Sequence, residues 1–237
     1  MNNKIMPYSA SYRRILHRMG YYDYQQGFIF RHLNQGKGWD HHLKKCREFI
    51  LKAVDFVNPV KVTVLGSGWL LEVPLRELLE KGLEICLVDI IHPPEVIKQV
   101  AGLKNVSIHE EDLSGGLIEE VWKRAGTRSF LNRLPSLEIL QVPEYKPAED
   151  PGMVISLNIL TQLEALPEKL LRSKSGATCD EFLELRKEIQ QKHLAFLQKY
   201  KSLLITDYEE VFTEADGSIV EKPTVVINLP EGVRHED

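Results

Sequence analysis

Apolar runs and amphipathic stretches alternate along the chain and predict a series of strands and helices. Between positions 8 and 57 apolar residues recur at helical intervals, interrupted by a Gly36-Lys37-Gly38 turn. Beyond position 59, helical segments alternate with short apolar runs typical of buried strands, at residues 60–65, 83–88, 106–109, 153–157 and 201–206. Strands that alternate with helices are joined by crossovers, so the pattern predicts a mainly parallel sheet with helices on both faces.

Three segments add to this core. A turn at 214–218 separates two short extended runs and predicts antiparallel C-terminal strands. Residues 181–200 predict one long helix, whereas residues 127–151, with four prolines, predict a lid or an extra edge element. The expected fold is a doubly wound α/β fold with an N-terminal helical cap over residues 1–58 and a Rossmann-like domain over residues 59–237.

Composition excludes several classes of protein. A hydrophobic fraction of 43% and a charged fraction of 27% are typical of globular domains, and no segment has the ~20 apolar residues of a membrane span. The first residues lack the pattern of a signal peptide, so we expect a cytoplasmic protein without membrane partners. The three cysteines and eight histidines form no metal-spaced group, so we expect no metal site and reduced thiols.

The formal net charge of −4 conceals an asymmetry, because residues 1–52 contain ten Lys and Arg against three Asp and Glu. One interpretation is a solvated basic helical face. The other is a basic cap that attracts an anionic substrate. The overall negative charge argues against general nucleic-acid binding, although the basic segment leaves a nucleic-acid partner open.

A glycine pair follows the first buried strand, in the sequence Gly66-Ser67-Gly68. Glycines let a ligand approach the backbone closely, and free N–H groups at a helix start favour ligand acceptors. Proline is tolerated in the first turn of a helix, so Pro74 predicts a helix that starts near Leu70 or Leu71. The turn therefore predicts a nucleotide cradle, with an ordinary strand-to-helix turn as the alternative.

Two further positions bear on the type of nucleotide. The dinucleotide fingerprint Gly-x-Gly-x-x-Gly needs a third glycine where this chain has Leu71, which weighs against NAD or FAD. Asp89 closes the second strand, where a carboxylate can accept hydrogen bonds from ribose hydroxyls; the alternative is a helix cap or a solvated turn. The motifs of P-loop proteins and of Ser hydrolases are absent from the sequence.

The chain from about residue 60 to residue 163 resembles the class I S-adenosylmethionine (SAM)-dependent methyltransferases. The resemblance is carried by Val-Leu-Gly-Ser-Gly at 64–68, Leu-Val-Asp at 87–89, Glu-Asp-Leu at 111–113 and Val-Ile-Ser-Leu-Asn at 154–158. It implies that the glycine turn holds the methionine moiety, Asp89 the ribose and Asp112 the adenine amino group. The expected cofactor-binding residues are Gly66, Ser67, Gly68, Asp89, Ile90, Asp112, Leu113, Ser156 and Asn158.

Some positions depart from the family or keep simpler alternatives. Val64 stands where many members have an acid, and no helix fits between the last core strand and the final hairpin. The acids at 109–112 also suit a solvated loop, and Asn158 also suits a helix cap. In the N-terminal segment Tyr24, Trp39 and His42 are candidates to roof a substrate site, with simple packing as the alternative.

The sequence therefore favours a SAM-dependent methyltransferase that acts on a small molecule, an anionic one if the basic cap attracts it. The alternatives are an NAD(P)-dependent oxidoreductase on the same scaffold and a non-catalytic protein that binds SAM or a nucleotide. Methyl transfer requires positioning above all, so no fixed catalytic motif is expected.

Overall fold

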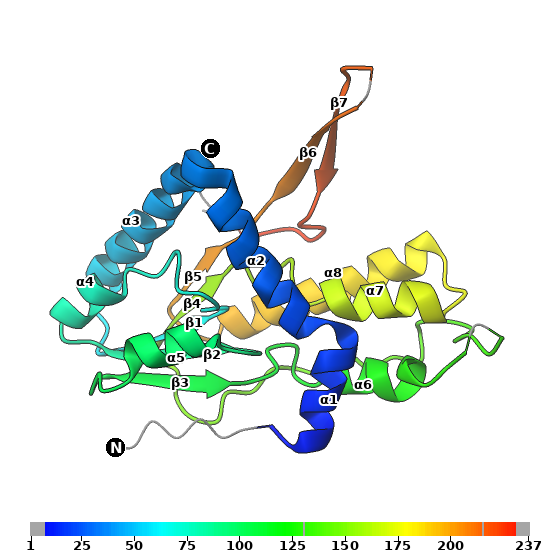
Figure 1. The fold of residues 1–237 in the computed structure, drawn as a ribbon, viewed down its shortest axis with the longest axis horizontal. Coiled ribbons are helices and arrows are strands. Elements are labelled where there is room, and N and C mark those ends of the chain that lie inside the picture. The colour runs from blue at the N-terminus through cyan, green and yellow to red at the C-terminus, as the bar shows by residue number, and fades with distance from the viewer. Residues whose placement is uncertain (1–7, 130, 215, 231–237) are drawn as a thin grey trace.

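Five parallel strands form the central sheet of the computed structural model, which describes residues 8–129, 131–214 and 216–230 (Figure 1). The strands are β1 (Lys61–Leu65), β2 (Glu84–Asp89), β3 (Val106–Glu110), β4 (Met153–Leu157) and β5 (Ser202–Ile205), in the order β3-β2-β1-β4-β5. In the centre of the sheet Val64 of β1 is paired with Leu87 of β2 and with Ile155 of β4. The predicted doubly wound parallel sheet is confirmed, at nearly the expected positions.

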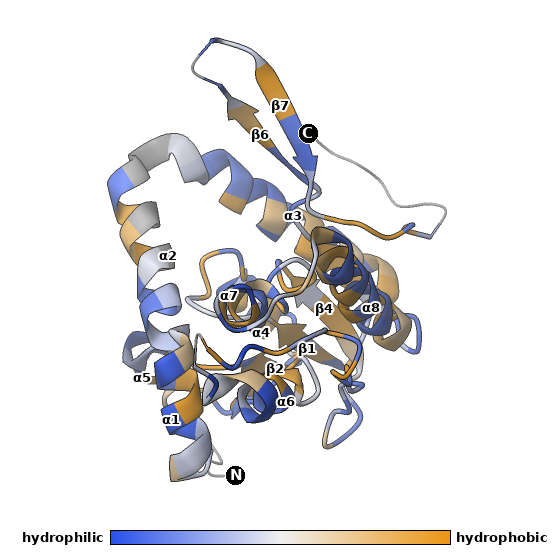
Figure 2. Ribbon diagram, turned by 90° about the vertical axis from the view of Figure 1, so that its right-hand side faces the viewer, coloured by the Kyte–Doolittle hydropathy of each residue, from blue (hydrophilic) through white to orange (hydrophobic). Residues whose placement is uncertain are grey.

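Helices cover both faces of the sheet because the strands bury both faces. Val62, Val64, Ile85 and Leu87 pack in one apolar cluster with α3 (Asp40–Val57), α4 (Leu75–Glu80) and α5 (Pro94–Val100). Leu65, Cys86, Val88 and Val154 pack in the other, with α6 (Leu117–Val121), α7 (Ala165–Lys174) and α8 (Cys179–Leu197). The alternation of side chains along each strand explains the two clusters, and Figure 2 shows the apolar strands between helices with polar outer faces.

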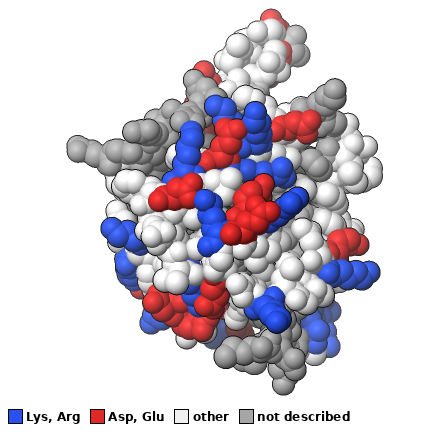
Figure 3. All heavy atoms as spheres, turned by 90° about the vertical axis from the view of Figure 1, so that its left-hand side faces the viewer, with Lys and Arg blue, Asp and Glu red and all other residues white. Residues whose placement is uncertain are grey.

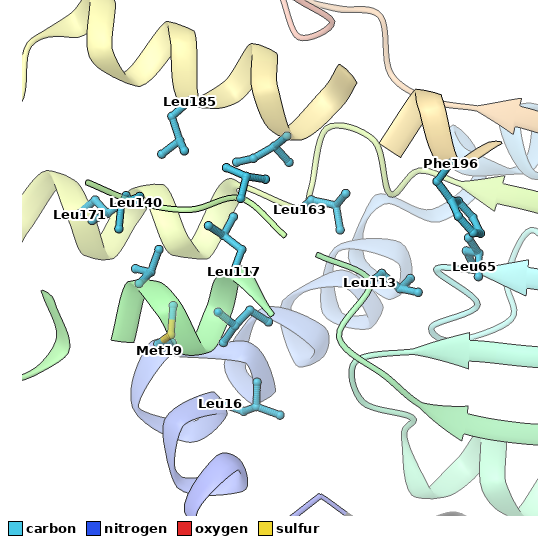
Figure 4. Packing of buried hydrophobic residues seen from close by; sticks show 14 of the residues in the cluster. Leu16, Met19, Leu65, Leu113, Leu117, Leu140, Leu163, Leu171, Leu185 and Phe196 are labelled. Atoms are coloured by element: carbon cyan, nitrogen blue, oxygen red, sulfur yellow. The ribbon is translucent and has the colours of Figure 1, made fainter. Parts of the chain in front are cut away.

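The N-terminal helices are α1 (Ala10–Met19), α2 (Tyr21–Gln35), the 3₁₀ turn Gly36–Trp39 and α3. The predicted helical N-terminal segment and its turn are confirmed. Leu16 and Met19 of α1 belong to the same buried cluster as Leu117 of α6 (Figure 4). These helices thus share the hydrophobic core of the sheet; the boundary at residue 58 stays a prediction. Residues 1–7, which contain most of the start on which the cytoplasmic expectation rests, lie outside the described residues.

Two antiparallel strands, β6 (Glu209–Thr213) and β7 (Ile219–Pro223), follow β5 without an intervening helix, as the sequence predicted. They form a separate sheet that projects from the body (Figure 1). Residues 224–227 continue past β7 without forming a strand, and Gln190 of α8 binds them, because its side chain contacts the Thr224 carbonyl and the Val226 N–H, each at 2.9 Å.

The predicted helix start near Leu70 or Leu71 is wrong, because α4 begins at Leu75. Leu70 has a φ of 58°, in the left-handed region, where an α-helix of L-residues does not begin. Its N–H donates to the Ser67 carbonyl at 2.8 Å, and Pro74 directly precedes the helix. A non-helical loop from Trp69 to Pro74 therefore lies between the glycine turn and α4.

The proline-rich segment 127–151 forms no regular strand or helix in its described part, apart from an isolated bridge between Leu134 and Ser175. It covers the helical layer: Leu134 and Leu137 are buried, and the Leu137 N–H donates to Glu181 of α8 at 2.9 Å. The segment is thus an extra covering element. In the described part of the chain no helix is both long enough and apolar enough to cross a membrane.

Candidate functional site

A cleft of about 960 Å³, open mouth included, lies at the carboxyl ends of β1 to β4. From β1 the chain continues to β2 and β3 on one side of the sheet, and from β4 it continues to β5 on the other side. The strand order therefore reverses between β1 and β4, and open α/β sheets bind ligands in the crevice at such a reversal. The walls of the cleft come from α2, the four strand ends, the loop before α4, the β4–α7 connection and the starts of α6 and α7. The lining includes Tyr21, Tyr24, Gln25, Gly66, Ser67, Gly68, Trp69, Leu71, Glu72, Asp89, Ile90, Asp112, Leu113, Ser114, Leu157, Asn158 and Gln162.

The glycine turn forms the floor of this cleft. A Cβ on Gly66 would lie 2.4 Å from the Leu157 carbonyl oxygen, so only glycine lets β1 leave the sheet this close to β4. Gly68 has a φ of 42°, and a Cβ on it would have an Asp89 carboxylate oxygen as its nearest neighbour, at 3.7 Å. Ser67 is buried, and its hydroxyl lies 2.8 Å from Nε2 of His92, which fixes the turn against the end of β2.

Asp89 ends β2 and is 4% exposed. One of its oxygens accepts from the Gly68 N–H at 2.8 Å; the other accepts from the Ile90 N–H at 2.7 Å and from Nε2 of Gln25 at 3.3 Å. Burial raises its pKa to about 6, although these backbone donors act in the opposite direction. The carboxylate is therefore ionised at neutral pH and is fixed beside the glycine turn, where Gln25 of α2 supplies it with a side-chain donor.

Asp112 follows β3 and belongs to the same wall of the cleft. Its Oδ2 accepts from the Tyr12 hydroxyl of α1 at 2.9 Å, and its Oδ1 accepts from the N–H and the hydroxyl of Ser114. Burial raises its pKa above the usual range, against those hydrogen bonds. Asp112 is therefore not in a solvated acidic loop, which was the alternative interpretation of the sequence, because Tyr12 of the N-terminal helix α1 binds its carboxylate.

Ser156 and Asn158, at the end of β4, were both expected to bind the cofactor, but only one of them lines the cleft. Ser156 is fully buried and does not line the cleft; its hydroxyl lies 2.8 Å from Nε2 of His193 in α8. Burial lowers the pKa of His193 to about 4, so this pair is a neutral link between sheet and helix. Asn158 does line the cleft, with a φ of 54° and its Nδ2 3.5 Å from Oε1 of Glu72.

The loop before α4 adds residues that sequence reasoning missed. Trp69 and Glu72 line the cleft, and Nε1 of Trp69 donates to the Gln25 carbonyl at 2.9 Å. The guanidinium of Arg47 in α3 binds the Leu71 carbonyl, with Nε at 3.0 Å, and so holds the loop on the protein surface. The expected helix start near Leu70 or Leu71 assigned Glu72 to a helix, and Trp69 was not considered as a site residue.

Of the three N-terminal candidates, only Tyr24 lines the cleft. The rings of Trp39 and His42 meet edge to face with centroids 5.7 Å apart, and Nε2 of His42 lies 3.5 Å from Sγ of Cys46. These two residues pack against their neighbours, which was the alternative interpretation of the sequence, and they do not line the cleft. Tyr21 and Gln25, on the same helix as Tyr24, are the cleft residues that this segment contributes in addition.

The charged residues in the described lining of the cleft are all acidic. Its charged lining residues are Glu72, Asp89 and Asp112, and no Lys, Arg or His lines it among the described residues. Described cations of the basic segment, such as Arg13, Lys44 and Lys52, are exposed on helices outside the cleft. On the face in Figure 3 cationic and anionic side chains are interspersed. For the cations whose side chains the structure describes, the solvated basic face fits better than a basic cap over the cleft; the side chains of Arg31 and Lys37 lie outside the described part.

Comparisons with known proteins give no relative. Neither a protein-family model nor a curated protein nor a solved structure matches the chain. Within the described ranges no group of three or more His, Cys, Asp or Glu side chains is placed to hold a metal ion. The residues that line the cleft are therefore the basis for a proposed function.

Proposed function

We propose that the cleft binds S-adenosylmethionine and that the protein transfers its methyl group to a small molecule. The observation that carries the proposal is the buried carboxylate of Asp89, 2.8 Å from the Gly68 N–H, in a cleft whose charged lining is entirely acidic in the described part. The sequence resemblance to class I methyltransferases agrees with the strand order and with the position of the turn.

The strand order arranges the residues along one line. Asp112, Asp89, the glycine turn and Asn158 follow β3, β2, β1 and β4, which are adjacent strands about 5 Å apart. An adenosine ligand laid along this edge has its adenine beside Asp112 and Ile90 and its ribose hydroxyls on Asp89. The Gln25 amide now bound to Asp89 is then replaced by hydroxyl donors, which preserves the hydrogen bonding of a buried carboxylate.

The cofactor would supply an electrophilic methyl group on a sulfonium. Carboxylates around the cleft favour a cationic ligand, and the aromatic lining residues Tyr21, Tyr24 and Trp69 add rings that attract cations. The contribution of the chain is to orient the donor, to exclude water with α2 and to hold the acceptor in line.

The same features disfavour a dinucleotide. A pyrophosphate carries negative charge into a cleft with three carboxylates, where like charges repel. Dinucleotide folds place that pyrophosphate on a helix N-terminus, but here α4 starts only at Leu75. Leu71 lies in the cleft wall where the third glycine of a dinucleotide turn would stand. An oxidoreductase function thus has less support than methyl transfer.

Calorimetric titration tests the proposal. The protein should bind S-adenosylhomocysteine at one site per chain and should bind NADH far more weakly. Asp89→Asn keeps the shape of the side chain but removes the charge, and we expect about a tenfold or greater loss of affinity. Glu95→Gln, an exposed change on α5, is the matched control and should bind normally. Saturating ligand without heat or thermal stabilisation of the wild-type protein would refute the proposed cofactor.

A further inference from the structure

Helix α2 lines the cleft and lies between two helices that are packed more firmly than α2 itself. None of its described side chains is fully buried, although Tyr21 and Tyr22 of its first turn pack partly against the core. The flanking helices α1 and α3 each contribute buried side chains. Gly20 and the 3₁₀ turn Gly36–Trp39 separate α2 from these helices, and both ribbon views show α2 as an arm between them (Figures 1 and 2). Little apolar burial therefore holds α2 in place beyond its first turn.

Beyond that turn, Gln25 joins α2 to the floor of the cleft. The Gln25 carbonyl accepts from Nε1 of Trp69 at 2.9 Å, and its side-chain Nε2 donates to Oδ1 of Asp89 at 3.3 Å. The same side chain lies beside the glycine turn, because a Cβ on Gly68 would be 3.9 Å from Oε1 of Gln25. The main chain and the side chain of one residue thus hold α2 beside the carboxylate that the proposed ligand uses.

The hydrogen bond from Gln25 to Asp89, here called the latch, opposes ligand binding. A buried carboxylate is stabilised by each donor that it keeps, so in the ligand-free protein the amide replaces the hydroxyl donors of a ligand. Hydroxyls that displace the amide gain only the difference between the two hydrogen bonds. The amide belongs to the same chain, so it returns to Asp89 more readily than a free ligand arrives. The latch therefore lowers the apparent affinity of the cleft, because only the unlatched state is competent to bind.

We propose that α2 is a gate over the cleft and that the latch between Gln25 and Asp89 keeps it closed in the ligand-free protein; this inference rests on the proposed function. A ligand with ribose hydroxyls exchanges them for the amide and opens the latch. A ligand of the same shape without these hydroxyls has no donor to exchange and leaves the latch intact. The gate is thus a regulatory element that responds to the ribose.

Calorimetric titration with adenosine and with 2′,3′-dideoxyadenosine tests the latch. Gln25→Ala removes the amide, so adenosine should bind about tenfold more tightly to this variant than to the wild type. 2′,3′-Dideoxyadenosine lacks the hydroxyls that compete with the amide, so the substitution should give it no gain in affinity.

Gln26→Ala is the matched control, because Gln26 is the exposed neighbour on the same helix and undergoes the same chemical change. This variant should bind both nucleosides as the wild type does. Unchanged or weaker binding of adenosine by Gln25→Ala would overturn the latch, since the amide would then be neutral or a ligand contact. An equal gain for both nucleosides would also overturn it, since a wider cleft would explain that result.

A measurement without ligand separates the gate from the proposed function. The Trp69 indole N–H is bound by the Gln25 carbonyl, so its hydrogen exchange, followed by NMR, should be faster in Gln25→Ala than in the wild type and in Gln26→Ala. Equal exchange rates would show that the latch does not hold α2 and would overturn the gate. If exchange is faster but neither the wild type nor Gln25→Ala binds adenosine or S-adenosylhomocysteine, the proposed function fails while the closed gate is supported.

Discussion

Alanine at the two glycines of the turn should destabilise the protein to different degrees. Both have positive φ, 78° at Gly66 and 42° at Gly68, so each substitution forces an L-residue into the left-handed region. The surroundings differ. A Cβ on Gly66 meets the Leu157 carbonyl oxygen at 2.4 Å, whereas a Cβ on Gly68 meets its nearest neighbour, an Asp89 carboxylate oxygen, at 3.7 Å.

The geometry sets the expected magnitudes. Left-handed backbone costs an L-residue about 1–2 kcal/mol, which is the whole cost expected for Gly68→Ala. Gly66→Ala adds a contact far inside normal distance to a backbone atom of β4, and separation of β1 from β4 costs about 2 kcal/mol more. The total for Gly66→Ala, about 3–4 kcal/mol, is a large part of the stability of an ordinary domain.

Urea denaturation followed by tryptophan fluorescence measures both free energies of unfolding. S-adenosylhomocysteine titration of the two variants measures binding, and Gly68→Ala should bind poorly while it remains folded, because its new methyl group points into the cleft. Equal destabilisation by the two substitutions would refute the contact with Leu157. Normal binding by Gly68→Ala would refute the ligand path over the turn.

Three other substitutions test buried contacts of the fold. Tyr12→Phe should destabilise the protein by about 2 kcal/mol, because buried Asp112 loses a donor; unchanged urea unfolding would contradict this. Burial lowers the pKa of His193 from 6.5 to about 4, so only the unfolded chain binds this proton between those pH values and stability falls as pH falls. Relative to His193→Gln, the wild type should lose about 3 kcal/mol from pH 7 to pH 4; parallel pH profiles would disprove the shift. Gln190→Ala should speed proteolysis near Thr224, and a digestion rate like that of wild type would show that the tether is unimportant.

The sequence predicted the strands well because their signal is local. The central strands β1, β2 and β4 are largely apolar, as burial on both faces of a parallel sheet requires, and 153–157 was predicted to the residue. The turn at Gly66 and Gly68 was found for the same reason, since glycine pairs after such runs mark a change of direction.

The partners of the site residues could not be predicted in this way. Tyr12 contacts Asp112 across 100 positions and Gln25 contacts Asp89 across 64, so only the tertiary packing of α1 and α2 brings them together. The loop after Gly68 was missed because a left-handed Leu70 has no sequence signal. For the same reason, the sequence did not predict that Glu72 lines the cleft.

A crystal structure of the protein with S-adenosylhomocysteine tests the central claim most directly. The account predicts that the ribose hydroxyls lie within hydrogen-bond distance of the Asp89 carboxylate, in place of the Gln25 amide, with the adenine toward Asp112. A ligand bound elsewhere, or a crystal soaked at saturation with the Gln25–Asp89 hydrogen bond intact and the cleft empty, would contradict it.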